Sequence, residues 1–122
     1  MSKIHALVDF FESFTWDAYD EASVPDDAGK RYITYEVKSD SIGNVLATTV
    51  NLWDYNESWL PITNKAEEIA ERIVTMYPMG IPLNNGRLVI TKGTPFAQRM
   101  PDEPSPWKRI VININIEFLT NY

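Results

Sequence analysis

The segment KRIVININIEFL at residues 108–119 constrains the fold of this chain more than any other stretch. Every second position in it is an isoleucine or a phenylalanine: Ile110, Ile112, Ile114, Ile116 and Phe118. Because side chains of a strand point alternately to the two faces of a sheet, this pattern predicts a long strand that is buried on one side. We expect Ile112 and Ile114 to lie under helices and to meet Ile69 and Ile73.

Two earlier segments predict an antiparallel hairpin. Residues 31–38, RYITYEVK, alternate with period two and place Ile33, Tyr35 and Val37 on one face. The turn-forming sequence SDSIGN follows, and residues 45–53, VLATTVNLW, supply the second strand of the hairpin.

The remaining strand comes from the C-terminal half of the chain. Residues 86–92, GRLVITK, predict a short strand that precedes the long one and forms a second hairpin with it. Between these two strands, residues 93–107 contain four prolines. We expect this segment to be irregular, because proline cannot donate to the hydrogen-bond ladder of a sheet.

Two amphipathic helices complete the predicted elements. Residues 2–14 and 62–76 repeat apolar side chains at steps of three and four, which gathers them on one face of a helix. Pro61 suits the first turn of the second helix, and residues 77–80, YPMG, end it. The order over residues 1–122 is helix, strand, strand, helix, strand, strand. It predicts a single α+β domain, a two-layer sandwich in which two helices cover one face of a mainly antiparallel four-stranded sheet.

The composition excludes several classes of function. With 17 acidic and 11 basic residues the net charge is −6, which argues against a general nucleic-acid-binding protein. The chain has no cysteine, so disulfides, thiolate metal sites and cysteine catalysis are ruled out. No apolar run approaches the roughly 20 residues of a membrane helix. The sequence shows no nucleotide-binding motif.

Few side chains point to catalysis or to metal binding. The one histidine, His5, is expected at the surface or the core edge of the first helix. Five carboxylates gather before the first predicted strand: Asp17, Asp20, Glu21, Asp26 and Asp27. Their spacing does not match an EF-hand loop, so a solvated acidic connector is the favoured interpretation and a Ca²⁺ site the alternative. We therefore do not expect an enzyme.

Aromatic, methionine and arginine side chains instead predict a contact with another subunit. The stretch LWDYNESW at residues 52–59 has two tryptophans and a tyrosine where a strand ends. We expect Trp59 to pack as a lid on the second helix and Tyr55 to face a neighbouring subunit, whereas Trp53 either completes the core or joins the interface. Arg99 is expected to meet a neighbour's acidic connector. The predicted interface comprises Trp53, Tyr55, Phe96, Gln98, Arg99, Met100, Trp107 and Arg109.

Several strings resemble proteins from the morphogenesis clusters of Firmicutes prophages, among them FFESF, VPDDA, ITYEV, KAEEIAERI, KGTPFAQRM and RIVININIEFL. Over nearly the whole chain the sequence is similar to the small tail-terminator, or tail-completion, proteins of long-tailed phages. The stretch MYPMGIPLNNGRL departs from the regular turn expected there, so the length of that loop is in doubt.

The resemblance implies a structural protein with helices packed on a sheet, without catalysis and without a cofactor. It also implies a homo-oligomeric ring, typically a hexamer, that caps the tail tube and docks to the head–tail connector. Such a protein is found in the host cytoplasm during assembly and then in the virion tail. The alternative is a monomeric module that binds a small molecule or a protein, or a minor enzyme, either of which needs a concave pocket.

Overall fold

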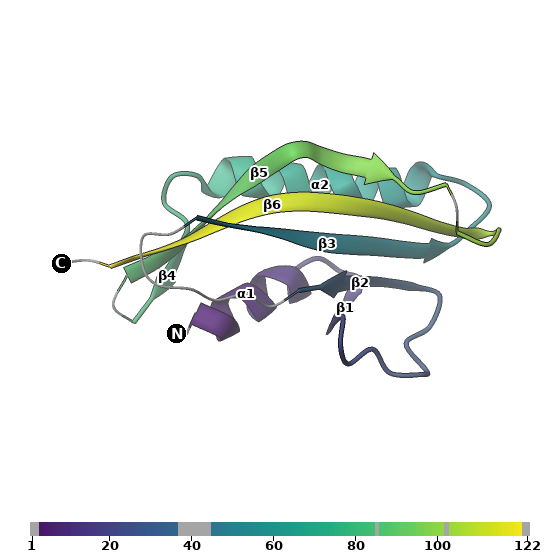
Figure 1. Ribbon diagram of the computed structural model, residues 1–122, viewed down its shortest axis with the longest axis horizontal. Coiled ribbons are helices and arrows are strands. Elements are labelled where there is room, and N and C mark those ends of the chain that lie inside the picture. Colours follow the sequence, from purple (N-terminus) through teal and green to yellow (C-terminus); the bar gives the residue numbers. More distant parts are fainter. Residues whose placement is uncertain (1–2, 37–44, 85, 102, 121–122) are drawn as a thin grey trace.

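The computed structural model describes residues 3–36, 45–84, 86–101 and 103–120 (Figure 1). These residues form two helices and six strands: α1 (Lys3–Glu12), β1 (Asp17–Asp20), β2 (Arg31–Tyr35), β3 (Val45–Tyr55), α2 (Leu60–Met76), β4 (Ile81–Leu83), β5 (Gly86–Arg99) and β6 (Trp107–Thr120). The helices lie close to the predicted ranges, whereas the set of strands is larger than predicted.

The strands form one mixed sheet that curls into a half-barrel. Its strand order is β1-β2-β3-β6-β5-β4; β1 runs parallel to β2, and the other neighbours are antiparallel. The predicted fold class, a two-layer sandwich with a four-stranded and mainly antiparallel sheet, is therefore wrong. Two strands that the sequence pattern does not reveal widen the sheet at its edges, and the twist between strands accumulates into the curl.

The additional strands, β1 and β4, have sequences that strands rarely use. β1 reads DAYD, with two aspartates, and β4 reads IPL, with a central proline. Aspartate and proline have low strand propensity, and segments this short carry almost no period-two signal. Pairing with β2 and β5 therefore decides their conformation.

Strand β5 is also longer than predicted, because it continues through Pro95 to Arg99. Its register against β6 shifts between Lys92 and Ala97, so Pro95 lies in a bulge where the ladder is interrupted. Since β4 pairs only with residues 86–88, this part of β5 has one described neighbouring strand. A proline is tolerated at such a place. The predicted irregular segment therefore begins only after Arg99.

Both predicted antiparallel strand pairs are confirmed, since β2 pairs with β3 and β5 pairs with β6. The predicted turn at residues 39–44 lies outside the described residues. Helix α2 ends as predicted, and Gly80 follows it with a φ of 70°. A side chain at this position would clash with the carbonyl oxygen of Leu88, so glycine lets the chain pass close to β5 before it enters β4.

Both helices pack on the concave face of the sheet and share one core with it. The alternating residues of β6 are all buried, as predicted, with at most 3% of each side chain exposed. Ile112 and Ile114 lie in the same core as Ile69 and Ile73 of α2. The core residues from α1 are Ala6, Leu7, Phe10 and Phe11, Phe14 follows the helix, and those from β2 and β3 are Ile33, Tyr35, Val50 and Leu52. Val37, predicted to share this face, is not among the described residues.

Candidate functional site

Five aromatic side chains form a continuous belt on the convex face of the sheet, opposite the helices: Tyr19, Tyr32, Trp53, Tyr55 and Trp107. They come from β1, β2, β3 and β6, which lie side by side. The strand register places Tyr32 opposite Trp53. Ile33 and Leu52, the next residues along these strands, are buried on the concave face, so the rings must point to the other side. We call this set the aromatic belt.

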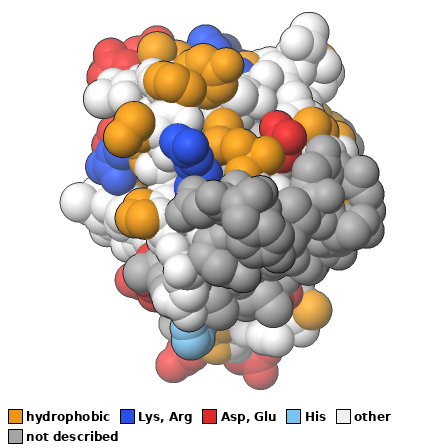
Figure 2. All heavy atoms as spheres, turned by 90° about the vertical axis from the view of Figure 1, so that its left-hand side faces the viewer, with side chains coloured by type: hydrophobic (Ala, Val, Ile, Leu, Met, Phe, Trp, Pro, Cys, Tyr) orange, Lys and Arg blue, Asp and Glu red, His pale blue; other side chains and the backbone are white. Residues whose placement is uncertain are grey.

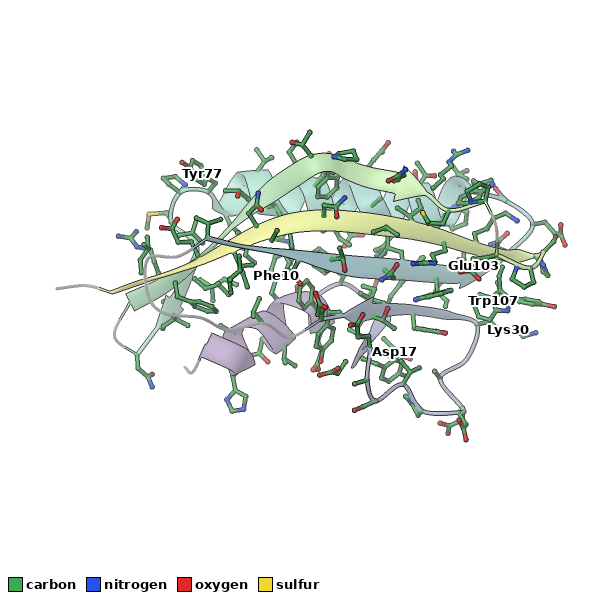
Figure 3. All side chains as sticks on the ribbon, viewed as in Figure 1. Phe10, Asp17, Lys30, Tyr77, Glu103 and Trp107 are labelled. Carbon is green, nitrogen blue, oxygen red and sulfur yellow. The ribbon has the colours of Figure 1, made fainter. Side chains whose placement is uncertain are left out.

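The rings of the belt contact one another across the strands. The ring centres of Tyr19 and Tyr32 are 6.0 Å apart, and Tyr32 lies 6.2 Å from both Trp53 and Trp107. Trp107, labelled in Figure 3, lies 5.3 Å from Tyr55. These separations fall within the roughly 4.5–7 Å of favourable aromatic pairs. Tyr55 forms the exposed end of the belt, with 41% of its surface accessible.

Arg109 holds the middle of the belt in place. Its guanidinium carbon lies 5.1 Å from the ring centre of Trp53, and its Nε donates to Asn51 Oδ1 at 2.9 Å. The same guanidinium pairs with Glu103 Oε1 at 3.1 Å. The indole Nε1 of Trp53 donates to the Thr34 hydroxyl at 3.1 Å. Because these contacts fix the rings before any partner arrives, the belt is a preorganised surface.

Charged side chains lie beside the aromatic belt at Tyr32 and at Tyr55. Burial raises the pKa of Tyr32 above its ordinary value of 10.0, and the carboxylate of Glu103 raises it further. The phenol of Tyr32 is therefore protonated at neutral pH. Lys30 lies at the Tyr55 end of the belt, where its ammonium nitrogen is 4.7 Å from the ring centre of Tyr55.

The predicted interface residues divide into two groups. Trp53, Tyr55, Trp107 and Arg109 meet in the belt. The others belong to β5 or to the residue that follows it: Phe96, Gln98, Arg99 and Met100. The structure therefore brings together half of the predicted set and places the other half on a different strand.

Phe96, Gln98 and Arg99 of this second group border a hollow between α2 and β5. It has a volume of about 260 Å³, and its walls include Thr63, Ala66, Phe96, Arg99 and Ile110. Phe96 packs in part against the core, so its side chain is half-buried. The walls are mainly apolar, and Arg99 is the cation among them.

A tryptophan between two cations stands beside this hollow. Trp59 packs against the core, as a lid would, and its ring centre lies 4.8 Å from the Arg99 guanidinium carbon and 5.6 Å from Lys108 Nζ. Neither cation has a carboxylate partner within the described part of the chain. The hydroxyl oxygen of Thr63 is buried and has no hydrogen-bond partner there either. We call the hollow together with Trp59 and its two cations the socket.

Sequence reasoning missed several residues of both regions. Tyr32 alternates with Ile33, so the pattern assigns it to the outer face, but only the strand register shows that it lies beside Trp53. Tyr19 is hidden because β1 itself is not predicted. Thr63 and Lys108 have no distinguishing signal, since each is an ordinary polar residue in a helix or a strand.

The structure also places the residues that were considered for catalysis and for metal binding. His5 is exposed on α1. The predicted acidic connector is partly wrong, because Asp17 and Asp20 are the end residues of β1. No group of three potential metal-binding side chains was found among the residues that the structure describes. Neither described helix is long and apolar enough to cross a membrane.

Exposed apolar side chains also gather at the end of α2. Figure 2 faces this end of the molecule and shows hydrophobic side chains near its top, beside Lys and Arg. Val74 and Tyr77 are each 58% exposed and Met79 is 72% exposed. Tyr77 is thus an exposed tyrosine outside the belt and serves below as a matched control for Tyr55.

No protein-family model matches the sequence, and no curated protein is significantly similar to it. The resemblance to phage tail terminators therefore stays a prediction, and the function has to be argued from the two surfaces.

Proposed function

We propose that this protein is a tail terminator of a long-tailed phage. In this role it is a structural protein whose copies form a hexameric ring. The ring caps the tail tube and joins the tail to the head, so its partners are the tube protein and the head–tail connector. It acts in the host cytoplasm during assembly and remains in the virion tail. The similarity of the strings quoted above first suggests this role.

The aromatic belt is the observation that carries the proposal. Tryptophan, tyrosine and arginine dominate the energetics of protein interfaces, and here they are fixed on a sheet face that the helices leave uncovered. Between Arg109 and Glu117, the convex positions of β6 and those opposite them on β3 include the uncharged residues Thr49, Asn51, Val111, Asn113 and Asn115. A broad surface with few charges and with aromatic anchors suits a large protein partner.

The hollow beside α2 favours a second candidate, a monomeric binding module. At about 260 Å³ it is smaller than the roughly 300–1,000 Å³ of typical ligand sites. A tail terminator needs partner copies, whereas a binding module does not. Mass in solution therefore discriminates the two candidates.

The proposal is tested in two steps. Light scattering at several concentrations should give the mass of a ring rather than the 14.0 kDa of one chain. The gene is then replaced, in the phage that encodes it, by Tyr55→Ala or by the matched control Tyr77→Ala. Tyr55→Ala should yield tails of uncontrolled length or tails without heads, because it removes the exposed end of the belt. Tyr77→Ala should give normal virions in electron micrographs.

Two outcomes would contradict the proposal. A strict monomer at every concentration favours the binding module. Normal virions from a phage that lacks the gene altogether would exclude the tail-terminator role.

A further inference from the structure

An acidic loop projects from one lateral side of the molecule. Residues 21–30 join β1 to β2 and protrude at the lower right of Figure 1. Local hydrogen bonds shape this loop: the amide of Ser23 donates to the carbonyl of Asp20 at 2.9 Å, and that of Ala28 to the carbonyl of Pro25 at 3.1 Å. We call residues 21–30 the acidic loop.

The side chains at the tip of the acidic loop are free to meet another molecule. Asp26 and Asp27 are exposed, and within the described ranges neither has an ion-pair partner. Just before them, Val24 and Pro25 provide a small apolar segment. The loop thus presents two apolar residues followed by two carboxylates.

The socket has the complementary chemistry. Its apolar walls include Ala66, Phe96 and Ile110, and Arg99 and Lys108 lie beside them without a carboxylate partner in the described structure. The buried hydroxyl of Thr63 has no described partner and needs one, because an unsatisfied polar group costs free energy. A peptide segment that brings a carbonyl group, apolar side chains and carboxylates would satisfy all three features.

The acidic loop and the socket lie at the same end of the sheet but on different strands. The loop joins β1 and β2, whereas the cations of the socket come from β6 and β5. Arg31 is the residue after the loop. In the strand register it lies opposite Asp54 of β3, and Asp54 lies opposite Lys108 of the socket. Arg99 lies one strand further along, on β5. The loop cannot be equivalent to the socket, so a contact between them joins two copies head to tail, the arrangement that closes into rings.

The charges of the two sides agree with this arrangement. Strand β5 contains Arg87, Lys92 and Arg99 and no acidic residue. Strand β1 and the acidic loop contain five carboxylates and, in Lys30, one cation. Opposite charges on the two sides favour the head-to-tail encounter and disfavour contacts between like sides.

We infer that the acidic loop of one copy binds in the socket of the next copy. Asp26 and Asp27 pair with Arg99 and Lys108, Val24 and Pro25 enter the hollow, and a carbonyl group of the loop accepts the hydrogen bond of the Thr63 hydroxyl. This contact rests on the proposed ring and identifies the two surfaces that build it. Glu67 also lines the hollow and opposes an acidic occupant, so Glu67→Gln should tighten the assembly.

Cysteine cross-linking tests the contact directly, because the natural chain contains no cysteine. Ser23→Cys places a thiol on the acidic loop, and Ala97→Cys, opposite the core residue Ile112 and in the wall of the hollow, places one at the socket; both leave the proposed charge pairs intact. Under oxidation, a mixture of the two single variants should give a covalent dimer. The double variant should give a ladder of higher multiples. The control mixture of Ser23→Cys with Thr49→Cys, on the convex face, should stay uncross-linked.

Charge reversal provides the second test. Asp26→Lys with Asp27→Lys, or Arg99→Glu with Lys108→Glu, should reduce the mass by light scattering to that of the 14.0 kDa monomer. The variant that carries all four changes should assemble again, because its loop and socket are once more of opposite charge. Urea denaturation checks that each variant is folded.

The outcomes separate this contact from the proposed function. If the wild-type chain forms a ring, but the cysteine mixture gives no dimer and charge reversal leaves the mass unchanged, the contact is wrong and the ring stands. If the wild-type chain is a monomer throughout and no cross-link forms, both the ring and the contact are wrong.

Discussion

The two faces of strand β6 carry opposite kinds of surface on one continuous segment. Its even-numbered residues from 110 to 118 are apolar and almost fully buried beneath the helices. Its odd-numbered residues face the convex side, where Trp107 and Arg109 join the aromatic belt and Asn113 and Asn115 follow. The same backbone therefore positions the core on one side and the aromatic belt on the other.

The buried centre of the concave face and the socket at its edge also differ in how their charges are compensated. On the concave face Asp54 is only 2% exposed, and Arg31 donates to its two carboxylate oxygens at 3.0 and 3.4 Å. Lys65, buried on α2, donates to Glu68 at 2.8 Å and to the Thr15 hydroxyl at 3.0 Å. Such groups need partners because an unpaired buried charge is costly.

The socket cations are in the opposite situation. Arg99 and Lys108 rest on the ring of Trp59 without a carboxylate partner in the described part of the molecule. Cation–π contacts leave room for a further anion. The contrast separates charges that complete the fold from charges that are available to a partner.

The largest effect is expected from the concave face. Ile114 is 1% exposed in the centre of β6, and Ile114→Ala removes its side chain from a closely packed core. We expect a loss of about 2–5 kcal/mol in the free energy of unfolding, measured by urea denaturation, because the site keeps a cavity.

The neighbouring convex position is the control for this prediction. Asn115→Ala, one residue away, should change stability by less than about 0.5 kcal/mol. If Ile114→Ala costs less than about 1 kcal/mol, or if the two changes have equal effects, the two faces are not divided as described.

This division is also the part of the fold that the sequence predicts best. The alternation in β6 and in β2 is specified by side chains whose burial follows directly from their period, so the concave face was predictable residue by residue. The edge strands were not, because Asp17, Asp20 and Pro82 disfavour strands and only their neighbours make them pair. Pro95 likewise predicts a loop, whereas a bulge keeps it within β5.

The candidate sites were predictable only in part, for a related reason. Residue type identifies Trp53, Tyr55, Trp107 and Arg109 as interface residues. Which of the predicted residues lie together depends on the strand order, and in particular on β3 pairing with β6. That pairing joins segments more than fifty residues apart, and no local pattern encodes it. The socket depends on the packing of α2 beside β5, which is equally non-local.

A smaller effect on stability is expected within the belt. Tyr55→Ala removes an edge-to-face contact with Trp107 and the contact with Lys30. Because the side chain is 41% exposed, we expect a loss of about 0.5–1.5 kcal/mol by urea denaturation, well below that of Ile114→Ala. A loss as large as that of a core residue would mean that the belt is part of the core, and its role in recognition would then be unsupported.

The smallest expected effect is a loss of stability at alkaline pH. It involves one tyrosine on each face of the sheet. Burial raises the pKa of Tyr35 above 10.0 on the concave side, with smaller contributions from Glu12 and Asp20. On the convex side burial raises the pKa of Tyr32, and the carboxylate of Glu103 raises it further. In both cases the folded chain holds the proton more tightly than the unfolded chain. The contribution of each tyrosine to the free energy of unfolding is therefore fully present below pH 10, and it is lost as the pH rises through the pKa of the folded state.

Two substitutions should separate the contributions of the two faces. Tyr35→Phe removes one ionisable group, so stability should fall less steeply above pH 10 than in the wild-type chain. Glu103→Gln removes the carboxylate that faces Tyr32 and should lower the pKa of that tyrosine, while the pKa of Tyr35 stays unchanged, since Glu103 does not contribute to it. Tyrosinate absorbance against pH, with Tyr32→Phe and Tyr35→Phe to assign the two curves, measures both. If Glu103→Gln shifted both tyrosines equally, the sheet would not separate the two environments, and the contrast between its faces would fail.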